Sequence, residues 1–106
     1  MILSKTPSNC ANKEEIRAHI DIIDKEIISL FAMRFQYVEE IVKFKSDAES
    51  VVALERKNEV ITKRGEWASA DGLDREVFEQ IYKLLIEHNI QKELDILNNK
   101  SQVNLN

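Results

Sequence analysis

The chain has 106 residues, a formal net charge of −4, 43% hydrophobic residues, 32% charged residues, two glycines and one proline. This composition is typical of one globular domain with few, long elements, and it contains no basic block of the kind that binds nucleic acid. Cys10 is the single cysteine, which excludes an intrachain disulfide and favours a reducing compartment. No apolar run reaches the ~18 residues of a membrane span. We therefore expect a cytoplasmic protein that binds neither nucleic acid nor membrane.

The first half of the chain predicts one long helix. Residues 1–11 are expected to form an extended leader, after which Asn12 and Glu15 make a capping-box pattern that begins a helix. No Gly or Pro interrupts residues 12–50, so the helix is predicted to reach about Lys45, roughly 50 Å at 1.5 Å per residue. Apolar residues recur along it at helical spacing, at Ile16, Ile20, Ile23, Ile27, Leu30, Phe31, Val38, Ile41 and Val42.

The second half predicts a loop and two further helices. Residues 46–53 are mostly small and polar, and a second helix is expected from about Ala53 to Ala70. Gly72 suits the left-handed residue that follows a helix, and Asp74 suits the cap of the next one. No stretch alternates as a strand does. The whole chain is thus predicted to be all-α, with three helices.

The domain boundaries follow from the same pattern. Residues 12–97 are expected to form a single helical domain, and residues 98–106 a polar tail that is disordered. Two shorter helices cannot cover the long first helix within a monomer whose compact radius of gyration is only ~13 Å. We expect an intertwined homodimer. The alternative is a monomeric bundle in which the first helix breaks.

Two cations lie on the apolar face of the first helix. Arg34 and Lys45 are eleven residues apart, close to three turns, so their side chains point the same way from Cα atoms roughly 16 Å apart. If they reach toward each other, the remaining gap suits a small dicarboxylate. The alternative is that both snorkel to solvent or that Arg34 pairs with a glutamate at the edge of the core.

Three further residues are candidates for an anion site. Arg17 lies about 25 Å from Arg34 along a straight helix, so only an antiparallel dimer would bring the two together; alone, Arg17 is a solvated residue. Arg56 begins the second helix, where a cation opposes the helix dipole, which indicates either a nearby anion or an ordinary surface arginine. Glu93 adjoins apolar residues and projects either into the bundle or into solvent. No metal-ligand spacing, nucleophile with its base, or glycine-rich phosphate loop is present, so we expect no metal or cofactor.

Five segments carry a likeness to a known family: KTPSNC (5–10), IRAHIDIIDKEIISLFAMR (16–34), YVEEIVKFK (37–45), ER (55–56) and WASADGLD (67–74). The second and third contain the combined pattern I-R-x-x-I-D-x-x-D, then L-x-x-x-R, then a closing V-x-F-K. Over about residues 5–97 the chain resembles the all-helical chorismate mutase family. It is most similar to the isochorismate pyruvate lyase branch, which makes salicylate for siderophores, and the KTPxxC leader strengthens that likeness.

The resemblance implies two equivalent sites in an intertwined dimer. Each site would take Arg17 from one subunit and Arg34, Lys45 and Arg56 from the other. Arg17 and Arg34 would bind the substrate carboxylates, and Lys45 would lie beside the ether bond that breaks. A lid over the site would be formed by Ser46, Asp47, Ala48, Glu49, Ser50, Val51, Val52 and Ala53.

The sequence departs from the family in three places. Glu93 replaces a glutamine that hydrogen-bonds the ether oxygen, and a carboxyl group must be protonated to donate. Activity is therefore predicted to fall as pH rises, and Glu93→Gln to flatten the profile. Lys57 and Ala53 stand where many mutases of the family have acidic residues, one of which holds the chorismate hydroxyl, and both replacements are typical of the lyase branch.

Three functions remain open from the sequence. The first is an isochorismate pyruvate lyase with weaker chorismate mutase activity, and the second is a chorismate mutase or a mutase of an amino analogue. Both reactions are pericyclic, so neither needs a nucleophile or a base; the protein would fold the substrate and place positive charge near the ether oxygen. The third is a non-catalytic helical interaction protein, in which Arg17, Arg34 and Lys45 would be replaceable.

Overall fold

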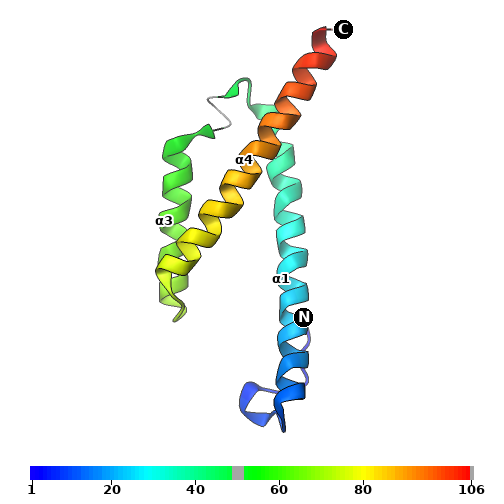
Figure 1. The fold of residues 1–106 in the computed structure, drawn as a ribbon, viewed down its shortest axis with the longest axis vertical. Helices are drawn as coiled ribbons and strands as arrows, with labels where there is room; N and C mark the ends of the chain where they lie inside the picture. The colour runs from blue at the N-terminus through cyan, green and yellow to red at the C-terminus, as the bar shows by residue number, and fades with distance from the viewer. Residues whose placement is uncertain (49–51, 106) are drawn as a thin grey trace. The chain divides into compact units, whose positions relative to one another are not determined.

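The computed structural model describes residues 1–48 and 52–105, with side chains to residue 99 (Figure 1). Its elements are a 3-10 turn η1 (Pro7–Asn9), the helix α1 (Lys13–Ile41), a second 3-10 turn η2 (Val42–Phe44), and the helices α3 (Leu54–Ala70) and α4 (Arg75–Leu105). The described residues contain no strand, and the all-α prediction is confirmed. The chain divides into two compact units, residues 1–37 and residues 38–106.

The leader is less extended than the sequence predicts. It contains the turn η1, in which the N–H of Asn9 donates to Thr6 O (3.0 Å) and that of Cys10 to Pro7 O (3.3 Å). The cause is local, because proline fixes its own φ near the helical value and lacks the N–H that a helix start leaves unsatisfied.

The start of α1 confirms half of the capping box and shifts the other half. Asn12 Oδ1 accepts the N–H of Glu15 at 2.9 Å, as an N-cap side chain should. The reciprocal bond from the Glu15 carboxylate goes to the N–H of Ala11 at 2.7 Å, one residue earlier than the pattern predicts. None of the 29 residues of α1 is buried.

The end of α1 differs from the prediction. The α-helix stops at Ile41 and tightens into η2, after which Lys45 is extended and its N–H donates to Val42 O at 3.0 Å. A 3-10 segment has about three residues per turn rather than 3.6. The eleven residues from Arg34 to Lys45 are therefore not three whole α-helical turns, so the spacing argument for a common direction of these two side chains does not hold.

The turn between α3 and α4 was predictable from sequence. Gly72 is left-handed at φ 79°. The N–H of Leu73 donates to Ala68 O (2.8 Å) and that of Gly72 to Ser69 O (3.1 Å), the paired bonds of a Schellman ending. Asp74 Oδ1 accepts the N–H of Val77 at 2.9 Å and so begins α4, as predicted.

The helices α3 and α4 pack against each other, and a glycine allows their close approach. A Cβ on Gly65 would lie 2.7 Å from Cγ of Glu79, so α4 occupies the space that a side chain would need. Val60 and Ala68 are buried in α3. The guanidinium of Arg64 lies 4.5 Å from the ring centroid of Trp67 and 5.8 Å from that of Tyr82 across on α4, which adds cation–π attraction to this packing.

The last helix is longer than predicted. It continues to Leu105, through residues that the sequence predicted as a polar tail. No Gly or Pro follows Gly72, and each residue added to an existing helix gains a backbone hydrogen bond, so nothing in this segment stops the helix. In the part of the chain that the structure describes, no helix combines the length and apolarity needed to cross a membrane.

Candidate functional site

A partly buried ion pair joins Lys45, the residue after η2, to α4. Lys45 Nζ donates to Glu93 Oε1 at 2.8 Å, and the two side chains are only 19% and 7% exposed. Val42 in η2 is 2% exposed, and η2 packs against α4, which fixes the backbone from which Lys45 extends. Of the two positions that the sequence left open for Glu93, the structure has the inward one, and it brings Lys45 and Glu93, two of the predicted site residues, together.

Asn89 is a third polar residue at this place and was not predicted as a site residue. It lies one turn before Glu93 on α4, is 5% exposed, and its Nδ2 has no hydrogen-bond partner among the described residues. A buried donor without a partner costs about 1–3 kcal/mol. The signal that could have found it is its spacing, because residues four apart on a helix share a face.

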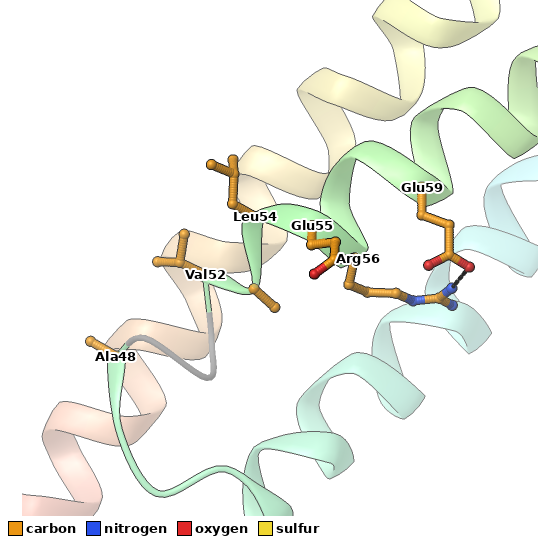
Figure 2. A pocket seen from close by; sticks show the side chains of 7 residues that line it. Ala48, Val52, Leu54, Glu55, Arg56 and Glu59 are labelled. Atoms are coloured by element: carbon orange, nitrogen blue, oxygen red, sulfur yellow. Dashed lines mark hydrogen bonds and ion pairs between the residues drawn. The ribbon is translucent and has the colours of Figure 1, made fainter.

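A pocket of about 740 Å³ opens at the start of α3 (Figure 2). Seven described residues line it, namely Ala48, Val52, Ala53, Leu54, Glu55, Arg56 and Glu59. Arg56 is the pocket's cation, and its guanidinium lies 3.4 Å from Glu59 Oε1 (Figure 2). The described lining residues do not include Lys45 or Glu93.

The predicted lid contributes to this pocket. Ala48, Val52 and Ala53 line it, Ser46 and Asp47 are exposed, and the predicted lid positions Glu49, Ser50 and Val51 lie outside the described residues. Ala53 itself is left-handed at φ 36° and ψ 61°, a conformation that costs a non-glycine residue roughly 1–2 kcal/mol. Its carbonyl accepts the N–H of Lys57 at 2.9 Å, the first bond of α3.

A second ion pair crosses from α3 to α4. Lys57 Nζ lies 3.1 Å from Glu87 Oε1, and the lysine side chain is 18% exposed whereas the glutamate is 47% exposed. Lys57 is therefore turned toward α4. An ammonium group has donors only, so this position cannot accept a hydrogen bond from a substrate hydroxyl.

Arg17 and Arg34 lie on α1, in residues 1–37, where Arg17 is exposed and Arg34 half-buried. Lys45, Arg56 and Glu93 lie in residues 38–106. The structure describes these side chains within each unit separately. Their predicted meeting stays a prediction.

The chemistry available in residues 38–106 is electrostatic. Lys45, Glu93 and Asn89 offer a partly buried ammonium, a carboxyl group and an amide donor. Among the described residues no group of three or more His, Cys, Asp or Glu side chains could hold a metal ion. Preorganised charge and donors of this kind stabilise charge that develops on a bound substrate.

Residues 16–94 match the family described as chorismate mutase type II, and the chain belongs to this family. The chain is also 31% identical over 90 residues to isochorismate pyruvate lyase of Pseudomonas aeruginosa. That alignment covers 85% of this chain and 89% of the relative. The family resemblance inferred from the sequence motifs is confirmed.

Proposed function

We propose that the protein is an isochorismate pyruvate lyase with weaker chorismate mutase activity. The observation that carries the proposal is the partly buried Lys45 ammonium, held by Glu93, with Asn89 one turn before Glu93 on α4; Nδ2 of Asn89 has no hydrogen-bond partner among the described residues. In the lyase reaction a ring hydrogen moves to the methylene of the enolpyruvyl group as the C–O ether bond breaks. The ring becomes aromatic, and the products are salicylate and pyruvate. The step needs neither nucleophile nor base, which fits a site made of charge and donors.

Each site residue has a proposed role. Lys45 stabilises the negative charge that grows on the ether oxygen, and this is the largest electrostatic contribution. Glu93 donates to the same oxygen when protonated, and Asn89 donates its free N–H to a substrate oxygen. Arg17 and Arg34 bind the two carboxylates, and Arg56 adds positive charge from the mouth of the pocket at the start of α3.

The proposed site is shared between two copies of the chain in an intertwined homodimer. The support is α1, whose apolar seam residues are strongly exposed within one chain: Ile16 at 44%, Ile20 at 49%, Ile27 at 42% and Leu30 at 53%. Exposed apolar residues repeated at helical spacing favour burial against another helix. A second copy would cover this seam and supply Arg17 to the site of its partner. Light scattering on the purified protein tests the dimer.

The side chains at positions 57 and 53 favour the lyase over the mutase. Lys57 is engaged with Glu87 and offers no acceptor for the chorismate hydroxyl, and Ala53 offers no carboxylate. The relative named isochorismate pyruvate lyase aligns over most of both chains, which supports the same choice. The second candidate is a chorismate mutase, which the match to the chorismate mutase type II family favours.

Product analysis with purified protein and each substrate separately tests the proposal. We expect salicylate and pyruvate in equal amounts from isochorismate, and only slow formation of prephenate from chorismate. Fast prephenate without salicylate would make the protein a mutase. No turnover of either substrate would contradict both candidates.

A further inference from the structure

Glu15 in the first turn of α1 binds the leader, residues 1–11, through its carboxylate. Lys5 Nζ lies 2.9 Å from both carboxylate oxygens of Glu15, and the N–H of Ala11 donates to Glu15 Oε2 at 2.7 Å. The backbone N–H of the same Glu15 donates to Asn12 Oδ1 at 2.9 Å. The carboxylate of Glu15 therefore binds two residues of the leader, Lys5 and Ala11, while the N–H of Glu15 is capped by Asn12.

A second attachment lies one turn further along the helix. His19 Nδ1 lies 2.7 Å from Glu15 O, and because a carbonyl oxygen only accepts, Nδ1 carries the hydrogen. In the neutral ring Nε2 is then an acceptor, and it lies 3.3 Å from the hydroxyl oxygen of Ser4, which donates. Glu15 and His19 are four residues apart, so both attachments are on one face of α1.

Arg17 lies between these two residues in the sequence and on the other side of the helix. Two residues rotate a helix by about 200°, so Arg17 projects away from the face that the leader covers. It is the fifth residue of α1 and is exposed. The first four N–H groups of any helix lack intrahelical partners, so this end frays unless other groups satisfy it.

We propose that the leader is a clasp that orders the first turns of α1 from behind, so that Arg17 is preorganised to bind a carboxylate of the substrate. Glu15 is the positioning residue and acts through Arg17. The inference rests on the substrate-binding role proposed above for Arg17. A guanidinium on a frayed turn would lose conformational freedom on binding, and the clasp removes that cost in advance.

A double-mutant cycle tests the clasp. Glu15→Gln removes the charge that Lys5 binds and keeps the size of the side chain, and Glu14→Gln removes the same charge from the same turn as a matched control. We expect Glu15→Gln to raise KM by about three- to tenfold with little change in kcat, because a ground-state binding residue is loosened. Glu14→Gln should leave KM within about twofold. In an Arg17→Ala background Glu15→Gln should have no further effect.

The same variants keep this inference distinct from the proposed function. If Glu15→Gln raises KM equally in the presence and in the absence of Arg17, the clasp is overturned and the role of Arg17 stands. The same holds if Glu15→Gln leaves KM unchanged while Arg17→Ala is impaired. An unimpaired Arg17→Ala enzyme would overturn the role of Arg17 and the clasp with it. Amide hydrogen exchange without any ligand gives an independent reading. Exchange over residues 15–19 should speed up in Glu15→Gln and not in Glu14→Gln, and unchanged exchange would contradict the clasp.

Discussion

Two ion pairs, one in each unit of the chain, differ in how far they are exposed to water. In residues 1–37 the pair of Lys5 and Glu15 is 41% and 34% exposed, and it joins a leader to the helix beside it. In residues 38–106 the pair of Lys45 and Glu93 is 19% and 7% exposed, and it joins segments 48 residues apart in sequence. The pair of Lys5 and Glu15 organises local structure, whereas the pair of Lys45 and Glu93 is largely shielded from solvent.

This difference separates the roles of the two pairs. Solvent screens an exposed pair, so the first pair acts mainly by restricting a short segment. A buried pair loses hydration worth several kcal/mol per ion, and pairing does not reliably recover it. The pair of Lys45 and Glu93 is therefore poorly explained by stability, which supports the role proposed for Lys45 in binding an anionic substrate.

Removing the buried cation should have the largest effect. We expect Lys45→Ala to lower kcat by about 10²–10³, because a preorganised electrostatic group near the reacting oxygen is lost. The matched control is Lys43→Ala, which removes an exposed lysine that pairs with Glu40 and should leave turnover unchanged. Steady-state kinetics and helix content by circular dichroism measure both variants. Near-normal turnover in Lys45→Ala would remove the distinction between the two ion pairs.

The carboxyl partner should give a pH-dependent effect. Glu93 accepts a hydrogen bond from Lys45 in the structure, and only its protonated form can donate to the ether oxygen, so activity of the natural protein is expected to fall as pH rises. Glu93→Gln carries a permanent donor and should give a flat profile. The measurement is kcat from pH 5 to 9 for both proteins. The same slope in both would show that Glu93 is not the donor.

Backbone strain should also differ between the units, because Ala53 and Gly72, the left-handed residues among those described, both lie in residues 38–106. A Cβ on Gly72 would meet no atom within 4 Å, so Gly72→Ala should cost only conformational strain, about 1–2 kcal/mol.

Ala53→Gly should stabilise the fold by up to about 1 kcal/mol, since glycine relieves the strain but loses more entropy on folding. Urea unfolding of both variants is the measurement, and destabilisation by Ala53→Gly would contradict the assigned strain.

The exposed pair should give the smallest effect, at acid pH. The hydrogen bond from Ala11 N–H and then that from Lys5 hold the pKa of Glu15 below its ordinary value, against a small opposing effect of desolvation, while His19 adds weak attraction. A lowered pKa means that the carboxylate stabilises the leader fully above the ordinary glutamate value and loses this effect as pH falls through the lowered one. Hydrogen exchange over residues 15–19 should therefore differ between the natural protein and Glu15→Gln at pH 7 and converge near pH 3. A constant difference would contradict the ionic attachment.

Local signals in the sequence predicted the helices and their caps well. Asn12, Gly72 and Asp74 act through bonds to residues within five positions, so their roles can be read from neighbouring residues alone. The turn at η2 was missed because no Gly or Pro marks it. Tertiary packing of Val42 against α4 accompanies it.

The candidate site was predictable by residue type and only partly by geometry. Lys45 and Glu93 were identified, but their direct pairing, the burial of Asn89 and the turn of Lys57 toward Glu87 depend on how α3, α4 and η2 pack. Such contacts join residues at least 30 positions apart. Spacing along one helix carries no information about them.

The central claim is that each site combines Arg17 of one subunit with Lys45 of the other. It is tested most directly by co-expressing two inactive variants, Arg17→Ala and Lys45→Ala, after each is shown to be impaired alone and dimeric. Half of randomly paired dimers are mixed, and each has one intact site of two, so we expect about a quarter of natural activity in the mixture. Activity no higher than that of the separate variants would contradict a shared site.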